Sequence, residues 1–148
     1  MAAAQANAYA TPDDMRSRLG EQIFSEIYNY RSEPEIRNDL EAAAAEIDGS
    51  VSARYVLPVA GERSLALLKD WNLTLCEERA YARAAGSEFS EKIKDRAALV
   101  RRNLDLIRKG EFRLPDAEEV GSGGTGGATL ALAQSDEPVF TRKRLRGF

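Results

Sequence analysis

The sequence predicts an all-α protein, and three observations carry that prediction. Apolar residues recur at steps of three and four over most of residues 11–115, which is the spacing of one helix face. Helix start and stop signals divide the same region at regular intervals. No convincing alternation of apolar and polar residues, the pattern of a half-buried strand, occurs in the 148 residues. We expect an antiparallel bundle of about four helices over residues 11–115.

The first helix is expected to begin at Thr11. Thr11 can cap it, Pro12 suits the first helical position, and Asp13 and Asp14 lie where the helix dipole favours negative charge. The segment Tyr30–Pro34 interrupts the pattern. The expected apolar face has four-residue steps and consists of Met15, Leu19, Ile23 and Ile27.

The second helix is expected from about Ser32 to about Tyr55, with Pro34 near its first turn. Its run of four alanines favours a helix and allows close approach of a neighbour. The dipeptide Leu57-Pro58 is incompatible with a continuing helix. The expected buried residues are Ile36, Leu40, Ala43 or Ala44, Ile47 and Val51.

Two longer helices complete the expected bundle. The third runs from about Ser64 to Ala85, with Gly86 as its stop, and the fourth from about Ser90 to Lys109, with Gly110 as its C-cap. The apolar positions of the third are Leu65, Leu68, Trp71 or Asn72, and Leu75. Those of the fourth alternate steps of four and three and are Ile93, Ala97, Val100, Leu104 and Ile107. Three charged pairs spaced for solvated helix contacts are Glu88/Lys92, Arg101/Asp105 and Asp105/Lys109.

The last third of the chain differs sharply from this body. A Gly-rich stretch over residues 121–127 precedes ten closing residues that hold four basic side chains and no acid. Those ten residues carry +4, and because the whole chain carries −3, residues 1–138 carry −7. A tether that ends in basic and aromatic residues is suited to reach another surface. The predicted binding residues are Phe140, Arg142, Lys143, Arg144, Leu145, Arg146 and Phe148.

The alternative interpretation of this ending is a disordered terminus without a role. The interleaving of apolar residues with the charges favours binding. We therefore divide the chain into a flexible N-terminal arm (1–10), a helical domain (11–115), an acidic and then Gly-rich linker (116–138) and a basic-aromatic arm (139–148). Phe112 and Leu114 are expected either to fold back or to lead out to the linker.

Composition narrows the possible functions. The chain has no histidine, so neither Cys/His zinc sites nor Ser-His-Asp or Cys-His catalysis can be built from it alone. The single cysteine, Cys76, excludes an internal disulfide and predicts an intracellular protein. No apolar run approaches a membrane span, and the first residues lack the pattern of a secretory signal. We expect no enzyme, no cofactor and no membrane partner.

Four local features have a structural and a functional interpretation. The glycines at 121, 123 and 126 match a dinucleotide fingerprint, but no strand precedes them, so we interpret them as a linker. Adjacent acids might suggest metal or acid–base chemistry, but helix neighbours point about 100° apart and do not converge on one ligand. We therefore expect Asp13/Asp14 to cap their helix and Glu77/Glu78 to form a solvated face. Cys76 is expected as a buried small hydrophobe, and Trp71 and Tyr81 as core or subunit-contact residues.

The basic arm has two candidate kinds of partner. Four charges could neutralise phosphates, which gives weak and salt-sensitive nucleic-acid binding. A body of −7 opposes that contact. A protein groove is the favoured partner, with the aromatic residues as anchors and the arginines on carboxylates. A helical nucleic-acid-associated regulator remains the alternative function.

Several segments together resemble a known family. They are Tyr9–Asp14 leading to Arg18–Glu21, Leu40–Gly49, Ala53–Pro58, Lys109–Leu114, and an ending of the form Phe-x-Arg-x-x-Leu-Arg-Gly-aromatic. In this order and spacing they resemble the head–tail adaptor proteins of Mu-like phages and prophages. The similarity covers about residues 9–115 and the closing arm.

The resemblance implies a structural virion protein that is assembled in the host cytoplasm and lies in the neck of the particle. Such proteins form twelve-subunit rings beneath the portal, extend the DNA channel and join the capsid to the neck or tail. The implied partners are the portal protein, further copies of the chain, and a neck, stopper or tail-terminator protein. Packaged DNA would pass without specific binding. The family offers no catalytic residues, and its portal-docking arm maps onto Phe140–Phe148.

Overall fold

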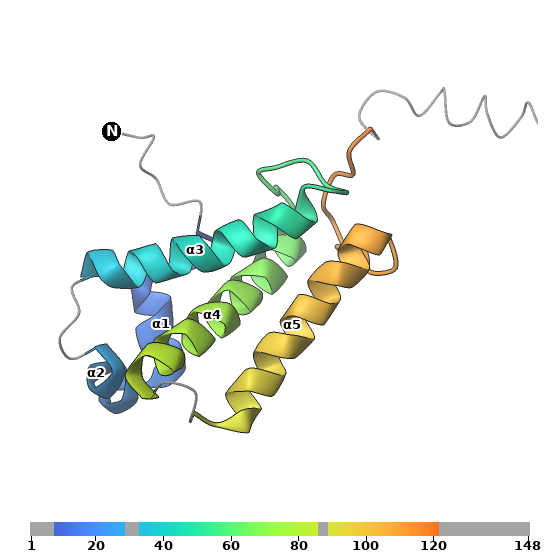
Figure 1. The fold of residues 1–148 in the computed structure, drawn as a ribbon. Helices are drawn as coiled ribbons and strands as arrows, with labels where there is room; N and C mark the ends of the chain where they lie inside the picture. Colours follow the sequence, from blue (N-terminus) through green and yellow to red (C-terminus); the bar gives the residue numbers. More distant parts are fainter. Residues whose placement is uncertain (1–7, 29–32, 86–88, 122–148) are drawn as a thin grey trace, which may run out of the picture.

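The structure, a computed structural model, describes residues 8–28, 33–85 and 89–121. This part of the chain is all-α, as predicted, but it contains five helices rather than about four. In Figure 1 α4 lies between α3 and α5, while α1 and α2 lie together where α3 begins and α4 ends. The helices are α1 (Pro12–Leu19), α2 (Glu21–Tyr28), α3 (Glu33–Val51), α4 (Glu62–Ala85) and α5 (Glu91–Lys109).

The extra helix arises at Gly20, where the predicted first helix is split in two. Gly20 has φ +80° and ψ 153°, a conformation that side-chain-bearing residues rarely adopt. The chain changes direction there, so the apolar face predicted across the break shifts beyond it. Ile23 is 41% exposed and Ile27 is only partly buried against the core, while Phe24 and Tyr28 are buried. Met15, which precedes the break, is buried as predicted.

The beginning of α1 forms as the sequence predicts. The Asp14 amide donates to Thr11 Oγ1 at 3.3 Å, and the Thr11 amide donates to Asp14 Oδ2 at 2.8 Å. This reciprocal pair is a capping box. The segment just before it also packs on the bundle, since Ala10 is buried and its amide donates to Asn72 Oδ1 at 3.1 Å.

Helices α3 and α5 bury the faces that their spacing predicts. Every residue of both predicted stripes is buried, including both Ala43 and Ala44. Gly110 ends α5 in the left-handed conformation, with φ +77°. Helix α3 stops at Val51, and a turn rather than further helix leads to Tyr55. The Asp105/Lys109 pair forms at 3.0 Å.

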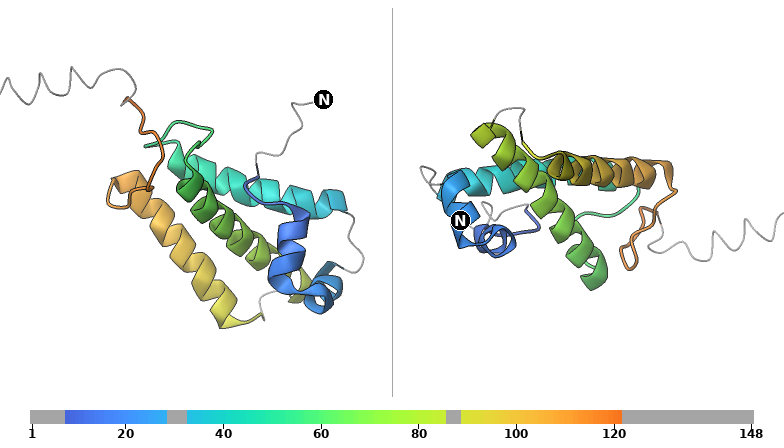
Figure 2. Two further views of the ribbon diagram at one scale, coloured as in Figure 1. Left: turned by 180° about the vertical axis from the view of Figure 1, so that it is seen from behind. Right: turned by 90° about the horizontal axis from the view of Figure 1, so that it is seen from below.

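Helix α4 is the central helix. Seven consecutive residues, Trp71–Glu77, are buried, because the helix packs against α1, α2, α3 and α5. Of the predicted apolar positions, Leu68 and Leu75 are buried as expected. Trp71 and Asn72 are both buried, whereas Leu65 is 37% exposed. Cys76 is buried as predicted. Figure 2 shows α4 between its neighbours from behind as well.

The buried polar groups of α4 are paired across helices. Asn72 Nδ2 donates to the Leu40 carbonyl at 2.9 Å, which satisfies both groups in the core. Arg18 Nε donates to Glu77 Oε2 at 3.1 Å. The predicted solvated face at Glu77/Glu78 is therefore wrong, since Glu77 is buried and Glu78 binds Arg101.

Arg101 has different partners from the one that its spacing suggests. Its Nε donates to Glu46 of α3 at 2.7 Å, and its Nη atoms donate to Glu78 of α4 at 2.7 and 3.0 Å. The predicted Arg101/Asp105 pair is replaced by these contacts, because a bidentate carboxylate is a better partner for a guanidinium. The hydrogen bonds that Arg101 donates, first to Glu78 and then to Glu46, raise the pKa of Arg101 further above its ordinary value.

Within the described residues, no helix is long and apolar enough to cross a membrane.

Candidate interaction site at the base of the C-terminal arm

The chain folds back on the bundle after α5. The amides of Glu111 and Phe112 both donate to the Leu106 carbonyl, at 2.9 and 3.2 Å. The Phe112 ring lies against Trp71 with 5.6 Å between ring centroids. Leu114 is buried. Of the two predicted courses for this segment, the structure shows the return to the bundle.

Tyr55 holds the segment that follows α5 against the bundle. Its ring is buried beyond the end of α3, and its hydroxyl accepts a hydrogen bond from the Leu114 amide at 2.9 Å. That amide is a buried donor in an irregular segment, so it needs such a partner. The end of α3 and the chain after α5 are thereby held together.

Asp116 caps the N-terminus of α4, although it lies 52 residues after Ser64 in the sequence. Its carboxylate accepts hydrogen bonds from the Arg63 amide at 2.9 Å, from the Ser64 amide at 2.8 Å and from Ser64 Oγ at 2.6 Å. The Ser64 hydroxyl and these amides lower the pKa of Asp116. A Cβ on Gly61 would overlap this carboxylate, so the cap requires a glycine there.

A short backbone pairing completes the attachment. The Val56 amide donates to the Glu118 carbonyl and the Val120 amide to the Arg54 carbonyl, both at 2.8 Å. These bonds flank an antiparallel bridge between Tyr55 and Glu119. Residues 110–120, which we call the anchor segment, are thus tied to the bundle at successive points. The first residues of the predicted linker, from 116 onward, belong to it.

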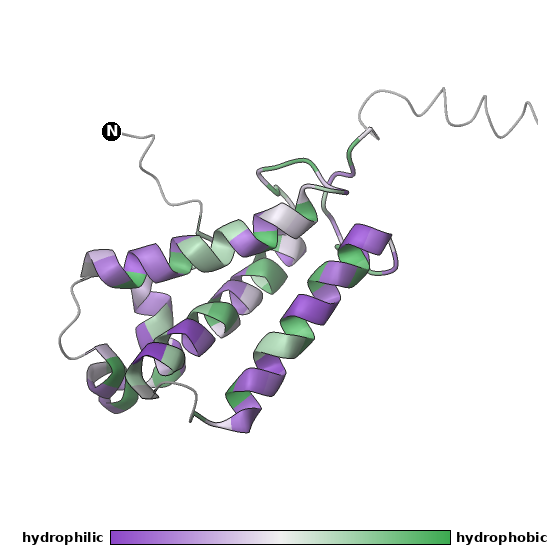
Figure 3. Cartoon of the chain, in the orientation of Figure 1, coloured by the Kyte–Doolittle hydropathy of each residue, from purple (hydrophilic) through white to green (hydrophobic). Residues whose placement is uncertain are grey.

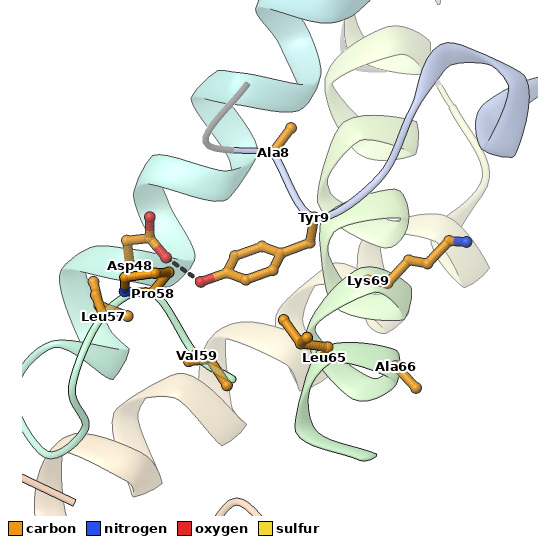
Figure 4. Close-up of a pocket in the computed structure, with 9 residues that line it drawn as sticks. All are labelled: Ala8, Tyr9, Asp48, Leu57, Pro58, Val59, Leu65, Ala66 and Lys69. Atoms are coloured by element: carbon orange, nitrogen blue, oxygen red, sulfur yellow. Dashed lines mark hydrogen bonds between the residues drawn. The ribbon is translucent and has the colours of Figure 1, made fainter. Parts of the chain in front are cut away.

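An open groove lies beside the anchor segment. Its volume is about 730 Å³, and Figure 4 shows Tyr9 projecting from the N-terminal segment between α3 and α4. The groove adjoins the anchor segment because Leu57–Val59 follow the paired residues directly and Leu65 follows Ser64. Its lining consists of Ala8, Tyr9, Asp48, Leu57, Pro58, Val59, Leu65, Ala66 and Lys69.

One hydrogen bond crosses the groove. The Tyr9 hydroxyl donates to Asp48 Oδ1, as the dashed line in Figure 4 marks. Burial raises the pKa of Tyr9, and the Asp48 carboxylate raises it further. Burial also raises the pKa of Asp48, against the lowering effect of the Tyr9 hydrogen bond. The remaining lining is mostly apolar, which suits binding of an apolar side chain.

The seven predicted arm residues, Phe140 to Phe148, lie outside the described residues. What the structure adds is the anchor segment, residues 110–120, which precedes them in the chain. Tyr55 and Asp116 were missed as functional residues, because their partners are more than fifty residues away and no local pattern reveals them. Among the described residues, no group of three or more acidic or cysteine side chains could hold a metal ion.

These features define a class: a small all-α protein whose chain, after its last helix, is anchored on the helices beside an open groove. The model of the family described as Bacteriophage Mu, Gp36 matches residues 9–130, so the chain belongs to that family. The match makes this a protein of the Mu-like phage type and suggests a structural or morphogenetic role. Neither the curated proteins nor the solved structures contain a match to the chain.

Proposed function

We propose that this chain is a head–tail adaptor. Twelve copies form a ring beneath the portal, extend the DNA channel and join the capsid to the neck or tail. Two findings support the proposal: membership of a Mu-like phage family, and an all-α body such as the resemblance implies.

The observation that carries the proposal is the anchored base of the arm. The anchor segment is held by Tyr55, by the Ser64 cap and by pairing with residues 54–56. Only 17 residues separate Gly121 from Val139, and at about 3.3 Å each they span at most roughly 56 Å. The closing arm can therefore reach an adjacent protein while its origin stays fixed on the subunit.

The chemistry of the arm favours a protein partner, the portal. Phe140 and Phe148 would act as anchors in apolar pockets, and Arg142, Arg144 and Arg146 would bind carboxylates. Ordering costs about 1–2 kcal/mol per residue in backbone entropy, so one arm should bind weakly. In a ring the later arms bind as if intramolecular, so attachment becomes tight only on the assembled portal.

Deletion of Val139–Phe148 tests this proposal. The truncated chain should keep its helical circular dichroism and its unfolding midpoint, because the described core and the anchor segment are built from residues 8–121. It should no longer co-sediment with purified portal rings. Deletion of Met1–Asn7 is the matched control and should leave co-sedimentation intact. Normal co-sedimentation by the arm deletion would refute portal docking by the arm.

The same preparations test the regulator alternative. Filter binding to duplex DNA over a range of salt concentrations should show little affinity, because residues 1–138 carry −7. Sequence-dependent affinity that survives physiological salt, and is lost with the arm, would favour the regulator. No catalytic role is proposed for any residue.

A further inference from the structure

The outer face of α5 carries an isolated apolar side chain among cations. Leu99 is 56% exposed, the highest value for a large apolar residue on the described helices. Arg96 and Arg102 are its neighbours three positions away on either side. Both are exposed, and neither forms an ion pair with another residue in the described ranges. We call Arg96, Leu99 and Arg102 the α5 face.

The charge of α5 supports an acidic partner. The helix has seven basic and three acidic residues, and hydrophilic colour covers most of its turns in Figure 3. An exposed apolar residue between unpaired arginines has the layout of an interface centre with its polar rim. A face of this kind needs a partner with negative charge around a shallow surface.

The outer face of α3 offers that surface on the same chain. Helix α3 has six acidic residues and one basic residue. Ala42, Ala45 and Gly49 are exposed along one stripe, so a neighbouring helix can approach closely there. Glu35 and Glu41 flank the stripe and have no ion-pair partner among the residues that the structure covers. We call these five residues the α3 face.

The two faces lie on different helices. Helices α3 and α5 each pack against α4 and against one another, and the α3 face and the α5 face lie on the sides of the two helices that point away from these contacts. A contact between two different faces is heterologous, and repetition of a heterologous contact closes a ring when the rotation allows. Contacts of α5 with α5, or of α3 with α3, would bring like charges together.

We propose that the α5 face of one subunit docks on the α3 face of a second copy. Leu99 packs on the stripe of small residues, and Arg96 and Arg102 pair with Glu35 and Glu41 of the neighbour. This contact deepens the proposed adaptor function, on which its role in ring closure rests, because it supplies the lateral interface. The occupant of each face is thus another copy of the chain.

Disulfide trapping tests the contact on the full chain. Tagged Leu99→Cys protein is mixed with untagged Ala45→Cys protein at rising concentration and oxidised. The native thiol does not compete, since Cys76 is buried and burial raises its pKa to about 12. We expect several-fold more mixed dimer than from Leu99→Cys with Ser25→Cys, an exposed position on α2 that lies on neither face. Equal yields from the two pairs would overturn the proposal.

Charge reversal tests the orientation in the same assay. Arg96→Glu/Arg102→Glu on the Leu99→Cys chain should abolish the excess of mixed dimer. Glu35→Lys/Glu41→Lys on the Ala45→Cys chain should restore it, because attraction returns with the signs exchanged. Both reversed chains should keep the wild-type circular dichroism, since all four side chains lie outside the core. Failure of the second reversal to restore cross-linking would contradict the assigned pairing.

The assay is separable from the adaptor proposal. Trapped dimers without co-sedimentation on portal rings would leave the lateral contact standing and remove the adaptor function. Co-sedimentation on portal rings together with equal yields from the two cysteine pairs would leave the adaptor function standing and remove the lateral contact.

Discussion

At the scale of single residues, Arg18 joins the N-terminal helix to the centre of the bundle. Its guanidinium donates to Glu77 at 3.1 Å, to Asp70 at 3.0 Å and to Thr74 at 2.9 Å, all on α4. The Glu77 side chain is only 9% exposed, so Arg18 is its essential counter-charge. A buried carboxylate without a partner is strongly destabilising.

Replacement of Arg18 should therefore be costly. Arg18→Ala should lower the free energy of unfolding by about 2–3 kcal/mol, somewhat less than for a fully buried pair. Arg16→Ala, two positions earlier and with a 52% exposed side chain, should cost less than about 0.5 kcal/mol. Urea denaturation compares the two. Equal losses would show that Glu77 does not depend on Arg18.

Asp116 gives the anchor segment a dependence on pH. Its pKa is lowered in the folded protein, so its stabilising effect is complete above the ordinary aspartate pKa and is lost as pH falls through the lowered value. Asp116→Asn should reduce the urea midpoint at neutral pH, and the difference from wild type should shrink in acid. Asp105→Asn, at an exposed pair on α5, is the control. If the difference in urea midpoint between Asp116→Asn and wild type stayed constant with pH, the ionised Asp116 carboxylate would not be what stabilises the cap.

At the scale of elements, a feature of a helix could be predicted from the sequence only where it depends on residues close to one another in the chain. The stripes of α3 and α5 could be predicted because each helix buries one face, so their periodicity is visible. Helix α4 is buried on several sides over Trp71–Glu77, which removes the periodicity. Its ion pair through Glu77 and its cap through Asp116 depend on residues more than fifty positions away. Such contacts leave no local pattern in a single sequence.

The break at Gly20 is an element-scale feature with a direct test. Gly20→Ala should destabilise the protein by about 1–3 kcal/mol, because alanine must adopt a conformation that favours glycine. Gly49→Ala lies within α3 with open space around it and should stabilise the helix by about 0.5–1 kcal/mol. Opposite signs in thermal unfolding are expected. A neutral Gly20→Ala would indicate that α1 and α2 can fuse into one helix.

At the scale of the whole molecule, the helices and the anchor segment have separate proposed tasks. The five helices of the described residues carry the proposed lateral faces, and the anchor segment holds the chain after α5 against the bundle. The sequence predicted the helical class and singled out the closing arm, whose residues lie beyond the described ranges. It did not reveal the anchor segment or the groove, since both are built from segments distant in sequence.

The central claim is that this chain forms the ring between portal and tail and grips the portal with Val139–Phe148. An electron cryo-microscopy map of the phage particle that encodes it tests this most directly. The account predicts twelve copies below the portal, with density for the closing ten residues on portal side chains. Density for the chain elsewhere in the particle, or for those ten residues along their own subunit, would contradict it.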